Sequence, residues 1–340
     1  MPCASSLEPC ALTGLHQQVR RTIRRHNLCP PGSRLLVGIS GGSDSVALAL
    51  LLLDLAANKE FSVASLAHVN HQLRPSADRD EAFCRDLAVR LGLPIAVERF
   101  DVKAYGTSHG LSIEDAARRV RYDFLGRAAA QAEATCVAVG HTQDDQAETF
   151  LLKLIRGAGL TGLGGIYPRR GLIVRPLLDV SRAELRAYLA GRGEPWMEDE
   201  SNEDVENPRN RVRHVVLPEL DRTARGETRP AIARAAALVR EDGEWLDELS
   251  RERFAAVASL TPEGVEIDAA RLAAEAPPVV RRVLLEAMRG TAGGREIGLD
   301  HVEAVRAILC GNDRGIDLPG SRVELRRGKL VLMRQKGASK

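Results

Sequence analysis

Short apolar segments of strand length alternate with longer segments of helical pattern through the first half of the chain. The expected strands are residues 34–40, 61–69, 94–100 and 135–140, with a fifth candidate at 172–177. The expected helices are residues 45–57, 76–91, 113–132 and 144–156. Strands that alternate with helices of this length form βαβ units, so the pattern predicts an α/β fold with a doubly wound parallel sheet. Ligands of such a sheet bind at the carboxyl ends of its strands.

The strand pattern stops after about residue 181, and helical segments dominate to about residue 289. A last helix at 299–309 precedes two short alternating segments, 323–325 and 330–333, which are typical of strands. A length of 340 residues is long for one hydrophobic core. We therefore expect a Rossmann-like α/β domain followed by a smaller, mostly α-helical domain with a short C-terminal β segment. The expected boundaries are 1–215, 216–295 and 296–340.

The composition restricts the class of protein. The chain has 48 Lys and Arg against 46 Asp and Glu, and this net charge of +2 excludes a polybasic nucleic-acid binder but not a local basic groove. The six cysteines include no Cys-x-x-Cys pair, so a zinc ribbon or a dithiol redox centre is not expected. The longest apolar run, residues 46–53, is too short to span a membrane. These features predict a soluble, cytoplasmic protein with no membrane contact.

A polar, glycine-rich turn lies between the first expected strand and the first long helix. Its residues are Ser40, Gly41, Gly42, Ser43, Asp44 and Ser45. Backbone N–H groups at such a turn and at the following helix N-terminus form an anion cradle, and the glycines let the backbone approach a phosphate closely. Asp44 would repel a bare phosphate, which indicates a Mg²⁺ ion between them. No Gly-Lys-Ser/Thr follows, so the turn is not a Walker-type P-loop.

The same turn permits a second interpretation. Residues 38–42 match the Gly-x-Ser-x-Gly pattern of a nucleophile elbow, in which Ser40 would be the nucleophile. Asp300 and His301 are then the nominal acid and base in the required order. A hydrolase of that class has several strands before its elbow, whereas this chain has room for one helix and one strand. The phosphate cradle is therefore favoured.

Two further polar motifs follow expected strands. Residues 67–74 read Ala-His-Val-Asn-His-Gln-Leu-Arg, and residues 140–148 read Gly-His-Thr-Gln-Asp-Asp-Gln-Ala-Glu. Asp145 and Glu148 share a helix face at this spacing. Such a carboxylate pair can bind and deprotonate an amine nucleophile. Together with Asp144, the pair is also a candidate for holding Mg²⁺ or a cationic substrate.

Several arginines follow patterns that suit phosphates. Arg118 and Arg121 share a face of the helix that begins near residue 113, where a solvated charged face is the competing interpretation. The glycine-rich loop at 156–165 is a mobile lid, an RNA contact or a simple connection. Residues 209–213 carry three arginines after an acidic run at 198–206, so phosphate contacts and salt bridges to those acids are both open.

In this order, the motifs resemble those of the tRNA(Ile)-lysidine synthetases, a family of the PP-loop (N-type) ATP pyrophosphatase superfamily. The Ser40–Ser45 motif alone indicates the superfamily, and the ordered set indicates the family. The resemblance covers about residues 20–220. It continues through Arg-Gly-Ala-Gly-Leu at 156–160, Arg-Pro-Leu-Leu at 175–178, Asp-Glu-Ser-Asn at 199–202 and Arg-Asn-Arg-Val-Arg at 209–213.

The resemblance implies a two-step reaction on the wobble cytidine of a tRNA(Ile) with a CAU anticodon. ATP adenylylates the C2 oxygen of the cytosine and releases pyrophosphate, and L-lysine then attacks C2 and expels AMP, which leaves lysidine. The amine must lose a proton, against a reference pKa of about 10.4. Residues 1–215 would then be the catalytic ATP-binding domain and residues 216–295 a tRNA-binding domain. The resemblance leaves homodimer formation open.

The resemblance also implies roles for single residues. Ser40–Ser45 would bind the pyrophosphate end of ATP, with Asp44 and Asp144 as Mg²⁺ ligands. Asp145 and Glu148 would bind lysine and accept its proton, and Arg118 would balance phosphate charge, although Arg121 is the alternative on the same helix face. The expected adenine contacts are Ala67, His68 and Val69. The expected tRNA contacts are Arg74, Arg156, Arg209, Arg211 and Arg213.

Two alternatives remain. Another PP-loop tRNA-modifying enzyme of the sulfur-inserting kind typically needs paired active-site cysteines, and Cys84 and Cys136 are unpaired in the sequence. A non-catalytic tRNA-binding module would bind RNA without releasing pyrophosphate. Because acids concentrate near residues 140–148 and 198–206, the small net charge still permits a segregated basic surface, which we expect around Arg156 and Arg209.

Overall fold

The computed structural model describes residues 14–73, 76–198, 207–311 and 315–335. The chain forms two compact units, Met1–Leu238 and Val239–Lys340. The boundaries of this division differ from those expected at 215 and 295. The reason lies in the second unit, where strands on both sides of residue 295 belong to one sheet.

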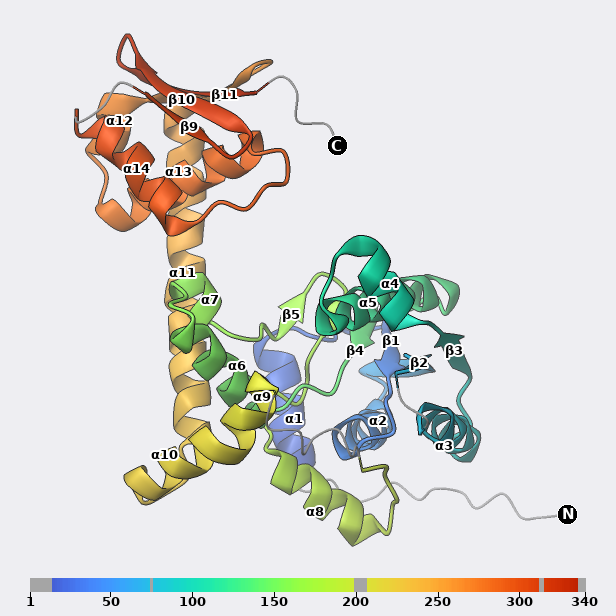
Figure 1. The fold of residues 1–340 in the computed structure, drawn as a ribbon. Helices are drawn as coiled ribbons and strands as arrows, with labels where there is room; N and C mark the ends of the chain where they lie inside the picture. Colours follow the sequence, from blue (N-terminus) through green and yellow to red (C-terminus); the bar gives the residue numbers. More distant parts are fainter. Residues whose placement is uncertain (1–13, 74–75, 199–206, 312–314, 336–340) are drawn as a thin grey trace, which may run out of the picture. The chain divides into compact units, whose positions relative to one another are not determined.

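The first unit is built on a six-stranded sheet with the strand order β3-β2-β1-β4-β6-β5 (Figure 1). Its strands are β1 (Ser33–Gly38), β2 (Phe61–Asn70), β3 (Ile95–Arg99), β4 (Cys136–Ala138), β5 (Arg169–Arg170) and β6 (Ile173–Val174). All neighbours are parallel except β5 and β6. The predicted parallel sheet is therefore confirmed. Because β2 and β4 lie on opposite sides of β1, the carboxyl ends of β1 and β4 flank the point where the strand order reverses.

The first unit contains helices on both faces of this sheet and helices that pack beside it. They are α1 (Gly14–Arg25), α2 (Ser43–Ala56), α3 (Ala77–Arg90), α4 (Val102–His109), α5 (Ile113–Gln131), α6 (Gln143–Ile155), α7 (Leu160–Leu163), α8 (Arg182–Arg192), α9 (Pro208–Arg211) and α10 (Leu217–Ala224), with a π-helical turn at Val212–Val216. One core joins α1, α2, α3 and α8 to the sheet, and a second core packs α5 on it. Helix α2 has ten buried residues between Ser43 and Leu55, so its neighbours enclose it. A helix enclosed in this way has apolar side chains on every side.

The second unit contains most of helix α11 (Arg229–Val257) and a five-stranded antiparallel sheet with the order β7-β8-β11-β10-β9. The strands are β7 (Ala258–Thr261), β8 (Gly264–Asp268), β9 (Gly315–Leu318), β10 (Ser321–Arg326) and β11 (Lys329–Arg334). Helices α12 (Ala269–Ala273), α13 (Pro277–Thr291) and α14 (Leu299–Leu309) complete the unit.

The β segment of the second unit is larger than expected from the sequence. The β7–β8 hairpin interrupts the region expected to be helical, and β9 adds a further strand. Strand β8 pairs with β11, which lies more than sixty residues later, with Asp268 opposite Lys329. A sheet built by such long-range pairing cannot be recognised from the sequence pattern of any single short strand.

Among the described residues, no helix is both long enough and apolar enough to cross a lipid bilayer.

Candidate active site

The phosphate-binding turn follows β1 and opens helix α2. The hydroxyl of Ser45 accepts a hydrogen bond from the Ser40 amide at 3.1 Å and donates one to the Gly42 carbonyl at 3.0 Å, which closes the turn. Gly41 has a φ of +88°, a conformation that favours glycine. Gly42 precedes α2 with no side-chain cap, so the helix N-terminus is open to an anion. The turn therefore has the geometry of the predicted phosphate cradle.

The segment after β4 packs directly on this turn. A β-carbon built on Gly140 would lie 3.1 Å from the carbonyl carbon and oxygen of Asp44 and 3.2 Å from the amide nitrogen of Ser45. This close backbone approach brings the 140–148 motif beside the 40–45 motif. The two motifs that were expected to meet at the carboxyl end of the sheet do so.

A capping box orients Asp145 in the first turn of helix α6. Thr142 is the N-cap residue, and Asp145 accepts hydrogen bonds at Oδ2 from the Thr142 amide at 2.8 Å and from its hydroxyl at 2.9 Å. With Oδ2 held in this way, Oδ1 faces away from the helix toward the guanidinium groups of Arg182 and Arg209, at 3.1 Å and 3.0 Å. The cap thus presents one carboxylate oxygen to cations.

Glu148 lies one turn further along α6 and is fully buried. Its Oε2 accepts from Nε of Arg209 at 2.8 Å, and its Oε1 accepts from Nε of Arg213 at 2.6 Å. Arg209 belongs to α9 and Arg213 to the π-helical turn, and their spacing of four residues puts both side chains on Glu148. A buried charge of this kind needs such partners.

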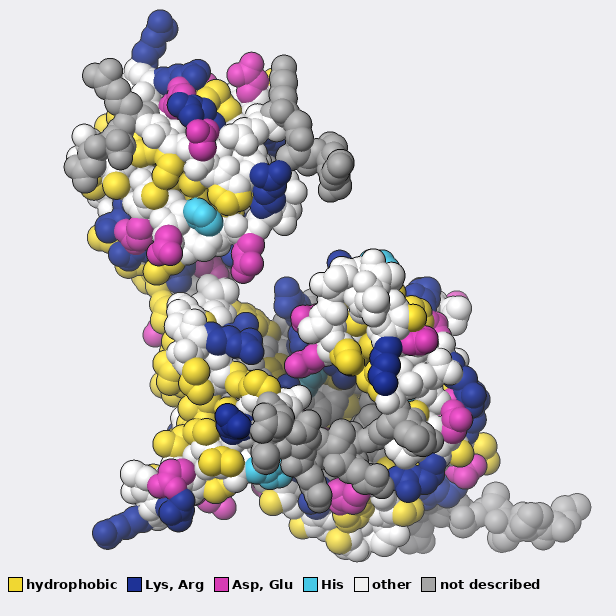
Figure 2. Space-filling view, viewed as in Figure 1, with side chains coloured by type: hydrophobic (Ala, Val, Ile, Leu, Met, Phe, Trp, Pro, Cys, Tyr) yellow, Lys and Arg dark blue, Asp and Glu magenta, His cyan; other side chains and the backbone are white. Residues whose placement is uncertain are grey.

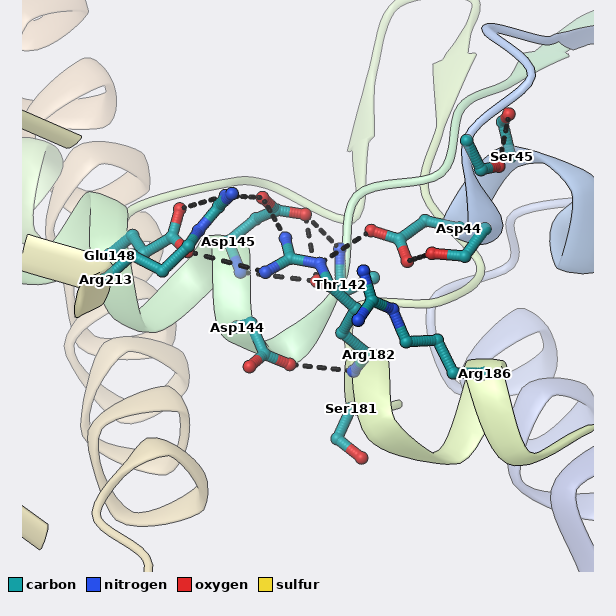
Figure 3. Close-up of polar contacts among 12 residues, drawn as sticks. Asp44, Ser45, Thr142, Asp144, Asp145, Glu148, Ser181, Arg182, Arg186 and Arg213 are labelled. Atoms are coloured by element: carbon teal, nitrogen blue, oxygen red, sulfur yellow. Dashed lines mark hydrogen bonds and ion pairs between the residues drawn. The ribbon is translucent and has the colours of Figure 1, made fainter. Parts of the chain in front are cut away.

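Figure 3 shows Arg182 at the start of α8 reaching between Asp44 and the acids of α6. Its Nε donates to Oδ2 of Asp44 at 3.0 Å, its Nη2 donates to Oδ1 of Asp145 at 3.1 Å, and its Nη1 lies 3.7 Å from Glu148. Its backbone amide donates to Oδ2 of Asp144 at 2.8 Å. Four acids from two motifs therefore surround one arginine.

The pKa values follow from these contacts. Burial alone would raise the pKa of Asp145, but the charges of Arg182 and Arg209 outweigh it and lower that pKa to about 2. Asp44 behaves differently, since its burial raises its pKa more than the nearby Arg182 lowers it, and Asp145 raises it further. The negative charge of Asp44 is thus only partly balanced by Arg182. Such a carboxylate favours the binding of an added cation.

A group of cationic side chains lies on the α5 side of the site. Arg175 donates from Nε to Nδ1 of His141 at 3.2 Å, which leaves the other ring nitrogen of a neutral His141 as the donor. Burial, with help from Arg175 and Arg121, lowers the pKa of His141 to about 3 despite the opposing charge of Asp145. The guanidinium carbons of Arg118 and Arg121 lie 5.3 Å and 5.4 Å from the ring centre of Tyr122.

Arg118 and Arg121 of α5 are both exposed, and the charges of this group act on Arg121. Desolvation of its guanidinium lowers the pKa of Arg121, and the neighbouring charges of Arg118, Arg209 and Arg175 lower it further. In turn, Arg121 contributes to the lowered pKa values of His141 and His71. Both arginines lie at a similar distance from the Tyr122 ring, so which of the two faces the site stays a prediction.

The residues expected to contact adenine lie at the end of β2. Ala67 and His68 are buried, and Val69 is half-buried. Nδ1 of His68 lies 2.9 Å from the carbonyl oxygen of Ile39, which directly precedes the phosphate-binding turn. Its Nε2 has no hydrogen-bond partner among the described residues. His68 thus braces the turn, and its contact with adenine stays a prediction.

The expected tRNA-binding arginines have different surroundings. Arg74 and the Asp199–Asn202 motif lie outside the described residues. Arg156 and Arg211 are exposed. Arg209 and Arg213 pair with Asp145 and Glu148, and the basic surface expected around Arg209 stays a prediction.

Exposed apolar side chains lie close to Arg156 in the sequence. Figure 2 shows hydrophobic side chains gathered over α6 and α7. Leu154 and Ile155, which immediately precede Arg156, are 50% and 70% exposed. The basic surface expected around Arg156 stays a prediction.

The acids of the site fit a Mg²⁺ ion to different degrees. Asp44 fits, because it lies at the phosphate-binding turn and its carboxylate is incompletely compensated. Both oxygens of Asp144 are engaged, one by the Arg182 amide and one by Nε of Arg229 at 3.2 Å. The described residues contain no group of three or more His, Cys, Asp or Glu side chains that could hold a metal without a ligand's help. A metal here would therefore depend on phosphate oxygens.

Arg182 is the main residue that the sequence patterns did not single out. A signal was present, since Ser181 and Glu184 form a capping box that begins α8 at Arg182. The capping box did not reveal which acids Arg182 contacts, because Asp44 and Asp145 are more than thirty residues away along the chain.

The fold and the two motifs at the strand ends define a PP-loop protein, and the PP-loop domain family matches residues 14–220. The U34-tRNA thiolase NcsA from Methanococcus maripaludis is similar in fold, with a TM-score of 0.52 at 19% identity over 66% of this chain and 78% of that chain.

Closer relatives are proteins named tRNA(Ile)-lysidine synthase. The chain is 39% identical to the one from Geobacter sulfurreducens over 88% of its own length, and 36% identical to the one from Dehalococcoides mccartyi over 90%. It is 40% identical to the one from Thermus thermophilus over 89%. The chain belongs to the tRNA(Ile)-lysidine synthase family. It spans 64%, 67% and 57% of the lengths of these three relatives.

Proposed function

We propose that the chain is an ATP-dependent ligase that joins lysine to C2 of the wobble cytidine in a tRNA(Ile) with a CAU anticodon. The observation that carries the proposal is the cation site formed by Asp145 and Glu148, beside a phosphate cradle at the switch point of the sheet. A site for nucleotide phosphates and a site for an ammonium group are both needed for this ligation. Family membership supports the same reaction.

The first step forms a bond between the cytosine C2 oxygen and the α-phosphorus of ATP, and it breaks the bond from that phosphorus to the leaving pyrophosphate. Ser40–Ser45 would bind the phosphates through backbone N–H groups and hydroxyls. Asp44, with Asp144 as a second candidate, would hold a Mg²⁺ ion, which supplies charge neutralisation when bound. Arg118, with Arg121 as the alternative on the same helix, would balance the remaining negative charge.

The second step forms a bond between the lysine ε-nitrogen and C2, and it breaks the bond from C2 to the oxygen that carries AMP. Asp145 and Glu148 would bind the ammonium group and take up the proton that it loses. Arg209 and Arg213 would hold Glu148 in place rather than contact RNA directly. Arg74, Arg156 and Arg211 would then be the predicted RNA contacts.

Residues 216–295 would contact the body of the tRNA, and a homodimer stays a prediction. Ligation of lysine, rather than insertion of sulfur, is favoured because Cys84 is buried and its burial raises its thiol pKa to about 12, which leaves it unreactive.

The test uses the full chain with ATP, radiolabelled lysine and two tRNA transcripts that differ only in anticodon, CAU or GAU. We expect lysine incorporation and equimolar pyrophosphate release with the CAU transcript alone. RNA binding without pyrophosphate release would support a non-catalytic module and contradict the proposal. Pyrophosphate release that does not depend on the cytidine would contradict it as well.

A further inference from the structure

Arg182 links the two halves of the site. Among ion pairs between described residues, it is the cation that contacts both Asp44 of the phosphate turn and Asp145 of α6. Its side chain is only 19% exposed, so solvent screens these contacts weakly. Nothing in the reaction as proposed above uses this residue.

The backbone of Arg182 is firmly held. Leu185 and Leu189 of α8 are fully buried in the core of the first unit. Near the other end of the helix, Oδ2 of Asp54 accepts hydrogen bonds from the Tyr188 hydroxyl at 2.9 Å and from Arg192 at 2.6 Å. Since the helix is anchored at both ends, any change at Arg182 must be made by its side chain.

The cation position at the acid pair is already filled. Asp145 and Glu148 carry two negative charges, and the guanidinium groups of Arg182, Arg209 and Arg213 all lie within 4.0 Å of them. An incoming ammonium group would meet three cations on two carboxylates. One guanidinium must therefore leave before an amine can bind well.

Arg182 is the guanidinium with the fewest short contacts to the acid pair of Asp145 and Glu148. Arg213 holds Glu148 through two nitrogens at 2.6 Å and 3.1 Å, and Arg209 bridges both acids at 2.8 Å and 3.0 Å. Arg182 lies 3.7 Å from Glu148 and makes one 3.1 Å bond to Asp145. Its other short contact, at 3.0 Å, is to Asp44, the residue that nucleotide binding would engage.

We propose that Arg182 is a positioning residue that occupies the amine subsite on Asp145 until nucleotide engages Asp44, so that nucleotide binds before lysine. The proposal rests on the proposed function. When Asp44 turns toward bound nucleotide, Arg182 loses one of its two short contacts, and the phosphate oxygens attract its charge. The guanidinium moves toward the phosphates, and Oδ1 of Asp145 becomes free for the substrate ammonium.

The experiment is calorimetric titration of lysine into the full chain, without nucleotide and with saturating α,β-methylene-ATP and Mg²⁺, which cannot react at the α-phosphorus. In the wild-type chain, we expect nucleotide to increase lysine affinity by at least about tenfold. In Arg182→Gln, lysine should bind without nucleotide at least about tenfold more tightly than in the wild type, and the effect of nucleotide should largely disappear.

Arg186→Gln is the matched control. Arg186 lies one turn further along α8 and pairs with Glu198 at 3.1 Å, so the variant removes the same charge from the same helix. It should behave as the wild type does. Arg182→Lys keeps the charge and should keep lysine binding weak without nucleotide.

Lysine binding that is independent of nucleotide in the wild type overturns the proposal, even if Arg182→Gln does not fold. An equal dependence on nucleotide in the wild type and in a folded Arg182→Gln also overturns it, while leaving the proposed function intact. If no variant binds lysine under any condition, both the proposed function and this role fail.

Discussion

Gly140 lies against Asp44 so closely that a β-carbon on Gly140 would be 3.1 Å from the carbonyl group of Asp44. The atoms that it would meet are backbone atoms at the start of α2, which cannot rotate away as a side chain can. This contact holds the end of β4 against the phosphate-binding turn, and it couples the shape of one motif to the other.

Gly140→Ala should therefore weaken ATP binding by at least about tenfold, because the start of α2 must shift. The measurement is nucleotide binding by calorimetry or by a fluorescent analogue. Gly126→Ala is the control, since no heavy atom lies within 4 Å of the added β-carbon in α5. That variant should bind ATP normally and gain about 0.5–1 kcal/mol of stability from helix propensity. Unchanged ATP binding in Gly140→Ala would show that the close contact is not needed.

Asp145→Asn keeps the size and shape of the side chain and removes its negative charge. We expect lysidine formation to fall by at least about 100-fold, because the amine loses the carboxylate that binds it and takes its proton. Binding of tRNA, measured by filter binding, should persist. Asp123→Asn, which removes an exposed carboxylate from α5, should retain full activity. Full activity of Asp145→Asn would remove this residue from the site.

Asp44→Asn should raise the Mg²⁺ concentration needed for half-maximal nucleotide binding by at least about tenfold, because an amide oxygen is a weaker ligand for Mg²⁺ than a carboxylate. The measurement is nucleotide binding across a Mg²⁺ series, with chelator as the zero point. Asp144→Asn should give a smaller increase, since Arg182 and Arg229 already engage both of its oxygens. The same Mg²⁺ requirement in Asp44→Asn and the wild type would contradict metal binding by Asp44.

Glu81 predicts a pH dependence of stability. Burial alone would raise its pKa, but hydrogen bonds from Asn70, Arg99 and Arg85 lower it to about 2, against 4.5 for an ordinary glutamate. A group whose pKa is lowered by folding contributes stability above its unfolded pKa and loses that contribution as the pH falls toward its folded pKa. The stabilisation is therefore complete at neutral pH and decreases between about 4.5 and about 2.

Glu81→Gln should lower the free energy of unfolding by about 2 kcal/mol at neutral pH, which is typical for hydrogen bonds to a charged group. The difference from the wild type should shrink across the same acidic range. Urea unfolding at several pH values measures it. Asp86→Asn, an exposed change on the same helix, should leave the decrease of stability in the acidic range unchanged. A difference that stays constant with pH would mean that the charge of Glu81 does not contribute.

Residues close together in the sequence determined much of this site. Each βα junction can be predicted from its own residues, because strand pattern, turn chemistry and helix capping all act within a few residues. The turn at Ser40–Ser45 and the motif at 140–148 therefore lie where the sequence predicts, at the ends of neighbouring strands. The order of the motifs was also sufficient to indicate the family.

The tertiary structure alone decided which charges neutralise one another. The pairs of Arg182 with Asp44 and of Arg213 with Glu148 join residues 138 and 65 positions apart. Charges interact through space, and distance along the chain does not predict distance in the fold. For this reason, Arg209 and Arg213 were expected to contact RNA and instead hold the acids. The near-zero net charge says little about such pairs, because a sum over the chain does not show which groups meet.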